Sequence, residues 1–391
     1  MAERRLRRFL ASAPWGILGA LAILILVEGA VSQHSLDLAS AVTIGYTHSH
    51  QAIYTESRDS SVFAMGDSQI KAGISPRVIE KRSGRKTFNL AINGATAPMT
   101  YYMFEQAISR EPKPSAIIVD FKPTMLTIHP SIVLPGFSSE MNFGQCVDFA
   151  RTMKSSSFFA QLLTHKSIRS LKERWGIRQY VSSALAGKAI DQRLANFSTL
   201  SQWSADRGAN SNPVNPSIES IESPWDEGAY VHDTPVPFDI LNLVYVKRFL
   251  ELAEKNQIPV FWVAPPLNPK IQAKRDARGL DSTFTSLLRS SAERFQGLTV
   301  IDARRSCYPV RKFVDGAHLD REGAAIFSEG VADVLSESLR HSSDRNRWVN
   351  LPVFSPPTES LTSANETPIP LKVRDTQSVS KSGSNSGTSI R

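Results

Sequence analysis

Short apolar runs alternate with amphipathic helical patterns in two stretches of this chain. The runs are four to seven residues long, as in strands buried on both faces of a sheet. Helical patterns between them favour parallel pairing through crossover connections. We therefore expect an α/β fold with a doubly wound, mostly parallel, five-stranded sheet. The expected strands cover residues 61–65, 87–92, 115–121, 258–264 and 298–301.

Capping signals set the limits of the helices. Ser75-Pro76 is typical of an N-cap followed by the first helical residue, and Gly84 predicts where that helix stops. Near the other end, Asp320 is the expected N-cap of a helix over residues 321–339.

The alternation is interrupted between residues 130 and 236. This insert has mixed polarity, short helical patterns and a span rich in Pro, Asn and Ser from Asn210 to Pro224. Three tryptophans, Trp175, Trp203 and Trp225, fall within it. They either line a platform for a sugar or form a small core of the insert itself.

The N-terminus predicts a membrane segment. No residue from Phe9 to Val27 is charged, and an arginine cluster precedes this stretch. The length suits one transmembrane helix, and the arginines place the N-terminus in the cytoplasm. A cleaved signal peptide is the alternative, since Ala30-Val31-Ser32 resembles a cleavage site. Either way the rest of the chain is expected outside the cytoplasm, in the periplasm if the cell is Gram-negative.

The predicted organisation has four parts. Residues 1–32 form a basic stub and membrane anchor, and residues 33–57, which are polar and poorly periodic, form a stalk. Residues 58–345 form the α/β domain with its insert. Residues 346–391, rich in Ser, Thr, Pro and Asn, form a disordered tail.

Composition narrows the functional classes. The formal net charge is +8, but Arg4, Arg5, Arg7 and Arg8 supply half of it, and the rest is dispersed without a basic stripe. Nucleic acid is therefore not an expected partner. Two cysteines, Cys146 and Cys307, are too few for a disulfide scaffold or a zinc site. We expect neither a metal nor a cofactor.

Two short motifs carry the candidate chemistry. Gly66-Asp67-Ser68-Gln69 places a serine on a turn directly after an apolar strand, and Asp315-Gly316-Ala317-His318-Leu319 supplies a carboxylate and an imidazole. In serine acyl chemistry Ser68 would attack, His318 would accept its proton, and Asp315 would orient the imidazole. The carboxyl ends of parallel strands share one edge of a sheet, so the two motifs are expected to meet there.

The surroundings of Ser68 suggest an oxyanion site. A serine at a helix start faces free N–H groups, and the N–H of Gly94 after the second strand is a candidate second donor, with Asn93 beside it. Gly66 and Asp67 are expected to organise the turn.

These motifs resemble those of the GDSL/SGNH hydrolase superfamily. Gly66-Asp67-Ser68 is similar to the first conserved sequence block of that superfamily. Residues 89–95 resemble its glycine block, and residues 315–319 resemble its terminal block, which carries the acid and the base. Residues 258–266 resemble a later strand of membrane-anchored members linked to O-acetylation of polysaccharides, such as the alginate acetyltransferases. The resemblance covers residues 60–125 and 238–340, and implies a three-layer, flavodoxin-like arrangement. The chain departs from it at the third block, where Val119-Asp120-Phe121-Lys122-Pro123 lacks the usual oxyanion asparagine.

The resemblance implies an extracytoplasmic serine esterase or O-acyltransferase. Its substrate would be an acylated glycan or another ester, with acetyl as the expected acyl group, and polysaccharide-assembly proteins are candidate partners. The alternative is a non-catalytic scaffold of the same fold in such an assembly. The missing asparagine favours that alternative, since an oxyanion donor contributes roughly a hundredfold or more to turnover.

Overall fold

A computed structural model describes residues 15–188, 192–218, 228, 230–340 and 347–355. Six parallel strands form its sheet in the order β2-β1-β3-β4-β5-β6. The strands are β1 (Val62–Met65), β2 (Thr87–Asn89), β3 (Ala116–Val119), β4 (Val260–Ala264), β5 (Leu298–Asp302) and β6 (Trp348–Asn350).

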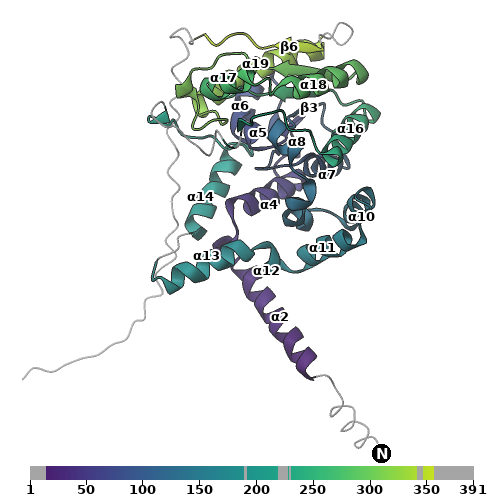
Figure 1. The fold of residues 1–391 in the computed structure, drawn as a ribbon, viewed down its shortest axis with the longest axis vertical. Coiled ribbons are helices and arrows are strands. Elements are labelled where there is room, and N and C mark those ends of the chain that lie inside the picture. The colour runs from purple at the N-terminus through teal and green to yellow at the C-terminus, as the bar shows by residue number, and fades with distance from the viewer. Residues whose placement is uncertain (1–14, 189–191, 219–227, 229, 341–346, 356–391) are drawn as a thin grey trace, which may run out of the picture. The chain divides into compact units, whose positions relative to one another are not determined.

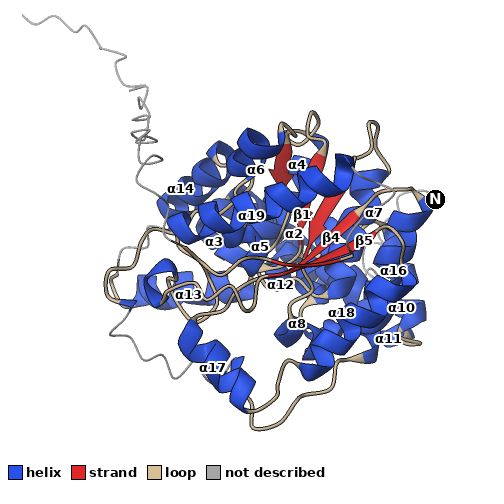
Figure 2. Ribbon diagram, turned by 90° about the horizontal axis from the view of Figure 1, so that it is seen from above, coloured by secondary structure: helices blue, strands red, loops and turns tan. Residues whose placement is uncertain are grey.

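Helices cover both faces of the sheet (Figure 2). Alternate strand residues point to opposite faces, so Phe63 and Met65 join one apolar cluster while Val62 and Ala64 join the other. The first cluster includes residues of α7 (Ala97–Ile108), α16 (Ile240–Lys255) and α18 (Ser282–Arg294). The second includes residues of α5 (Ser68–Gly73), α6 (Pro76–Ser83) and α19 (Arg321–Arg340). The predicted α/β class with a parallel sheet is confirmed.

The remaining helices are mostly short (Figure 1). Before the sheet come α2 (Trp15–Gln33), α3 (Ser35–Leu38) and α4 (Ala41–Tyr54). The insert contains η1 (Pro130–Ile132), α9 (Leu134–Phe137), η2 (Ser138–Glu140), α10 (Phe143–Thr152), α11 (Ser156–Ser167), α12 (Arg169–Lys172), α13 (Arg174–Leu185) and α14 (Gln192–Ala205). Three further elements are α8 (Pro123–Thr127), α17 (Pro269–Ala277) and η4 (Val310–Lys312).

The sheet has six strands and not the predicted five. The extra strand, β6, pairs with β5 and places Val349 opposite Ile301. It lies inside the stretch predicted to be a disordered tail, so that boundary was wrong. Residues 356–391 of the predicted tail lie outside the described residues.

The predicted stalk is also corrected. Helix α4 occupies most of residues 33–57 and packs into the fold, with Ile44, Tyr46, Ala52 and Ile53 buried. Its N-cap Ser40 accepts a hydrogen bond from the Thr43 N–H at 3.1 Å. Burial of this helix face makes the segment part of the α/β domain.

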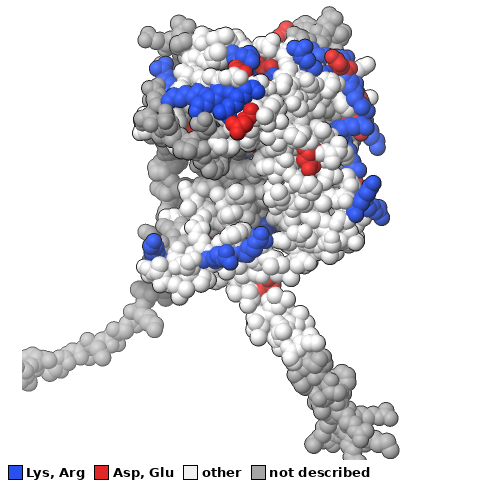
Figure 3. Space-filling view, viewed as in Figure 1, with Lys and Arg blue, Asp and Glu red and all other residues white. Residues whose placement is uncertain are grey.

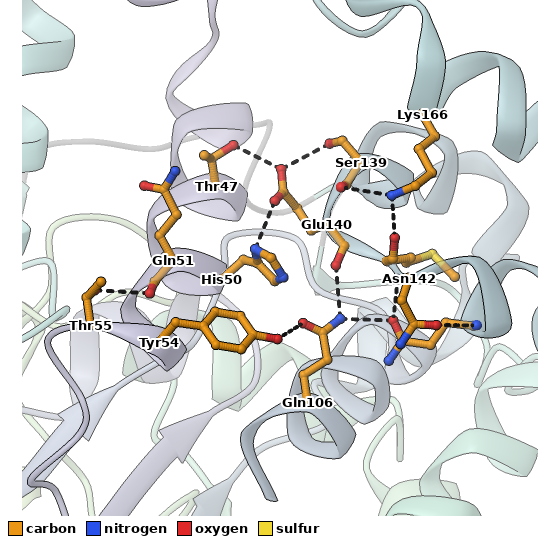
Figure 4. A network of polar contacts seen from close by, with 12 residues as sticks. Thr47, His50, Gln51, Tyr54, Thr55, Gln106, Ser139, Glu140, Asn142 and Lys166 are labelled. Atoms are coloured by element: carbon orange, nitrogen blue, oxygen red, sulfur yellow. Dashed lines mark hydrogen bonds and ion pairs between the residues drawn. The ribbon is translucent and has the colours of Figure 1, made fainter. Parts of the chain in front are cut away.

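Polar contacts fasten the insert to α4 and α7 (Figure 4). The buried carboxylate of Glu140 accepts hydrogen bonds from Thr47 and Ser139, both at 3.0 Å, and its Oε2 lies 3.2 Å from His50 Nδ1. The side-chain amide of Gln106 donates to the Glu140 carbonyl at 2.9 Å. The insert is thus an integral layer of the fold and not a loosely attached lobe.

Helix α2 is the one helix, among the residues that the structure describes, long and apolar enough to cross a membrane. Its side chains from Ile17 to Val27 are largely exposed. Only its last turns contact the body, where Glu28 accepts a hydrogen bond from the Ser170 N–H at 3.2 Å. A helix with an exposed apolar surface of this length is what a bilayer requires.

Candidate active site

The turn after β1 depends on Gly66. Its φ of +128° lies in the region that favours glycine, and a Cβ there would come within 1.8 Å of Asp120 Oδ1. The turn carries the chain from β1 into α5, so Ser68 begins the helix and its side chain is half-buried. The predicted sharp turn with a serine at a helix start is therefore present.

Asp67 organises this turn, as the sequence predicted. Its Oδ1 accepts the Gln69 N–H at 2.7 Å, which makes it the N-cap of α5. Its own N–H donates to Asp120 Oδ1 at 2.9 Å. Asp120 follows β3, so two neighbouring strands hold the turn between them.

The second motif forms a tight loop before α19. Asp315 Oδ1 accepts the backbone N–H groups of Ala317 and His318, each at 2.8 Å. The Val314 N–H donates to the His318 carbonyl at 2.9 Å. Asp320 caps the helix that follows, through the Gly323 N–H at 2.7 Å. The loop therefore fixes the directions of the Asp315 and His318 side chains.

The three predicted catalytic residues meet at this edge of the sheet. His318 Nδ1 lies 2.7 Å from Asp315 Oδ2, and His318 Nε2 lies 2.8 Å from Ser68 Oγ. With the ring proton on Nδ1, the imidazole donates to Asp315 and accepts from the Ser68 hydroxyl. Ser68 and His318 are 250 residues apart in the chain. The geometry is that of a nucleophile, a base and a group that orients the base.

Asp315 is held in its charged form. Burial acts to raise its pKa, but the His318 ring and the N–H groups of Ala317 and His318 outweigh burial, so the pKa is lowered. A charged Asp315 can stabilise the imidazolium that forms when His318 takes up a proton.

Gln69 connects the two motifs. Its side-chain amide donates to the Ala317 carbonyl at 3.2 Å, and the residue is buried. This contact gives Gln69 a structural role between the two motifs.

A late part of the insert also holds the loop of residues 314–319, called here the acid–base loop, through hydrogen bonds. Asn212 donates to the Leu319 carbonyl at 3.1 Å and Asn215 to the Val314 carbonyl at 3.2 Å, while the Asn210 N–H donates to the Lys71 carbonyl at 2.8 Å. The sequence showed only that this span is rich in Pro, Asn and Ser, and its role was missed. No local pattern could reveal the two contacts to the 314–319 loop, because they join residues 107 and 99 positions apart.

Two buried ionisable residues, Asp120 and Lys122, lie behind the turn, in the block that lacks the usual asparagine. Asp120 is buried, and burial together with the Asp67 charge raises its pKa well above the usual value. Lys122 lies 3.4 Å from Asp67 and 2.9 Å from the Tyr230 hydroxyl. Burial acts to lower the pKa of Lys122, but Asp67 and Tyr230 outweigh it and raise the pKa. Lys122 is therefore the group that balances the charge of Asp67, while the raised pKa of Asp120 favours its uncharged form.

The loop with Asn93 and Gly94 runs beside the serine turn. The Ile92 N–H donates to the Gly66 carbonyl at 3.0 Å, and both Asn93 and Gly94 are half-buried. Gly94 has φ +72°, and a Cβ built on it would meet no heavy atom within 4 Å. The open space around Gly94 leaves room for a substrate group.

A small cavity lies next to the site. Its volume is about 30 Å³, enough for about two water molecules. It is lined by Gln69, Asp120, Lys122, Tyr230 and apolar residues that follow β3 and β4. Among the described residues, no group of three or more His, Cys, Asp or Glu side chains is arranged to hold a metal ion. Cys146 is buried, Cys307 is exposed, and neither is in a disulfide.

Comparison with protein families gives one match, over residues 51–322, to the protein family of unknown function DUF1574. The chain belongs to the DUF1574 family. The matched region contains Ser68, Asp315 and His318 together with the insert. No curated protein matches the chain significantly.

Proposed function

We propose that this DUF1574 protein is an extracytoplasmic serine esterase or O-acyltransferase of the SGNH type. The observation that carries the proposal is the Ser68–His318–Asp315 arrangement, with contacts of 2.8 and 2.7 Å. Hydrogen-bonded contact of this kind activates a serine hydroxyl, which is a weak nucleophile by itself. The position of the serine after β1, where the strand order reverses between β1 and β3, is also where open α/β sheets bind ligands.

The reaction would proceed in two steps. Ser68 Oγ attacks the acyl carbonyl carbon while its proton moves to His318 Nε2, and the leaving alcohol departs with that proton. An acyl-serine remains. Water or a sugar hydroxyl then attacks the acyl group and gives its proton to His318. His318 passes this proton to Ser68 Oγ as the bond from Oγ to the acyl carbon breaks, which restores the free hydroxyl. Water as acceptor makes the protein an esterase, and a sugar makes it a transferase.

The N–H groups of Ser68 and Gly94 are the proposed donors to the developing oxyanion, with the Asn93 amide as a further candidate. The Gln69 N–H is engaged by Asp67. Each donor contributes about 3 kcal/mol to transition-state stabilisation when it is well placed. Asp120 follows β3 in the third block and has no side-chain amide, and its Oδ1 already accepts the Asp67 N–H.

Location and the resemblance to the SGNH superfamily support the proposed substrate class. Helix α2 with its preceding arginines suits a single anchor that leaves the catalytic domain outside the cytoplasm. The membrane-anchored members that residues 258–266 resemble are linked to O-acetylation of polysaccharides, which supports acetyl as the acyl group. We therefore propose acetyl esters of a cell-envelope or secreted polysaccharide as substrates, with polysaccharide-assembly proteins as partners.

A fluorophosphonate probe on the full-length protein in detergent tests the proposal. Wild type should be labelled covalently, and Ser68→Ala should not. Ser61→Ala, at the other end of β1, is the matched control and should label like wild type. Absence of labelling in folded wild type would favour a non-catalytic scaffold. The lack of an asparagine at Asp120 also favours that alternative. Comparing p-nitrophenyl acetate hydrolysis with acetyl transfer to oligosaccharides then separates esterase from transferase.

A further inference from the structure

Exposed apolar side chains outside α2 are concentrated on α13 and α14. Fourteen large hydrophobic residues outside α2 are exposed among the residues the structure describes, and six of them lie on these two helices. They are Trp175, Tyr180, Val181, Leu185, Leu194 and Phe197, with Leu185 85% exposed and Trp175 64% exposed. Soluble proteins rarely leave such a concentration of apolar groups in water without a function.

These helices lie at the end of the apolar part of α2. Helix α12 packs against α2, where the Ser170 N–H donates to Glu28 at 3.2 Å and Arg169 donates to Ser32 Oγ at 2.8 Å. Helix α13 continues from α12 and runs sideways from the end of α2 (Figure 1). Gly176 is packed so tightly on α3 that a Cβ would come within 1.6 Å of the Leu38 carbonyl oxygen. Contact with α3 thus fixes α13 at this level.

The exposed side of α13 is amphipathic and basic. Val181 and Leu185 are four residues apart and share one face of the helix, and Trp175 lies about 80° around the helix from Leu185. The guanidinium carbons of Arg174 and Arg178 lie 5.9 and 5.3 Å from the centre of the Trp175 ring. Neither α13 nor α14 contains an acidic residue. Figure 3 shows lysine and arginine side chains over α12 and α13, just above the point where α2 leaves the body.

We infer that α13 and the first turns of α14 lie on the membrane surface, at the interface from which α2 emerges. Aromatic and aliphatic side chains with flanking arginines are the composition of an interfacial helix, and the arginines would bind anionic lipid headgroups. Continuity with the apolar surface of α2 selects the bilayer over a soluble partner. This second attachment would fix the height and tilt of the domain. It rests on the proposed anchoring by α2.

Depth-dependent fluorescence quenching in the full-length chain tests this inference. Leu185→Cys is made in a Cys307→Ser background, where the remaining Cys146 is buried. It is labelled with bimane and reconstituted into phosphatidylcholine–phosphatidylglycerol vesicles brominated near the headgroups. Val353→Cys is the matched control, since Val353 is an aliphatic residue that is 66% exposed. It lies three residues after the end of β6, an element at the opposite end of the domain from α2 in Figure 1.

We expect bromolipid to lower the bimane fluorescence at position 185 by about half and to leave position 353 unchanged. If bromolipid lowers the fluorescence at position 185 no more than at position 353, in vesicles that float with the protein, the inference is overturned and the anchor stands. The exposed face of α13 would then be assigned to a protein partner. Protein that fails to float would overturn both the anchor and the surface helix.

Discussion

The contact between Asp67 and Asp120 makes the Ser68 turn sensitive to single substitutions. Two carboxyl groups share a buried space, which is unfavourable unless one of them is neutral. The raised pKa of Asp120, caused by burial and by Asp67, identifies Asp120 as the neutral partner. A neutral carboxyl group and an amide have nearly the same shape, so the site should accept asparagine at position 120.

We therefore predict that Asp120→Asn changes the free energy of unfolding by less than about 1 kcal/mol, since the amide oxygen can still accept the Asp67 N–H. Asp120→Ala should cost about 2–3 kcal/mol, because it leaves that N–H without an acceptor and opens a void. Thermal unfolding in detergent measures both. Equal destabilisation by the two substitutions would show that Asp120 is charged in the folded protein.

At the scale of elements, Lys71 on α5 is the least expected buried group. The residue is 1% exposed, and its ammonium group lies 3.4 Å from Ser49 Oγ and 4.6 Å from the centre of the Trp203 ring. Burial lowers the pKa of Lys71 from 10.5 to about 7, against the opposing charge of Glu56. Between these two pH values the unfolded chain binds a proton that the folded chain does not, so stability rises with pH across this range.

Lys71→Met removes this cost and keeps the side-chain volume. The variant should be more stable than wild type by a few kcal/mol at about pH 6.5, and the difference should shrink as the pH approaches about 10. Melting temperatures across this pH range measure the effect. Lys247→Met, at an exposed lysine on α16, is the control and should show no such trend. A pH-independent effect of Lys71→Met would contradict the assignment.

The sequence predicted those helices and strands whose positions are determined by a local pattern of residues. Strand β1 and helix α19 agree with the prediction to within one residue at each end, because an apolar run and the Asp320 cap mark them. Helix α4 was missed because its buried face includes His48 and Ser49, whose polar partners come from distant elements. Strand β6 was missed because three residues carry little pattern and their pairing depends on β5.

For the whole molecule, parallel topology made the meeting of Ser68 and His318 predictable. Ser68 and His318 follow different strands of one sheet, so the rule that ligands bind at the carboxyl edge was enough to bring them together. The asparagines of the insert could not be predicted in the same way. Asn212 and Asn215 reach the acid–base loop through a segment with no strand of its own, and no periodicity specifies where such a segment lies.

Retention of α2 would keep the whole molecule at the membrane and restrict the proposed substrates to those near it. We predict that α2 is retained in the mature protein and that alkaline phosphatase fused after Arg391 is active, because the four arginines before α2 keep the N-terminus in the cytoplasm. Retention also agrees with the contacts that α12 makes to Glu28 and Ser32. A cleavage after Ser32 would remove both partners.

Fusion activity and resistance to alkaline carbonate extraction measure these two expectations. Replacing Arg4, Arg5, Arg7 and Arg8 together by glutamine should lower the phosphatase activity, since it removes the charge that fixes the orientation of α2. The same fourfold replacement at the exposed Arg82, Arg278, Arg294 and Arg305 of the folded domain should leave the activity unchanged. A shortened, carbonate-extractable protein would establish the signal peptide instead, and the domain would then reach glycans far from the membrane.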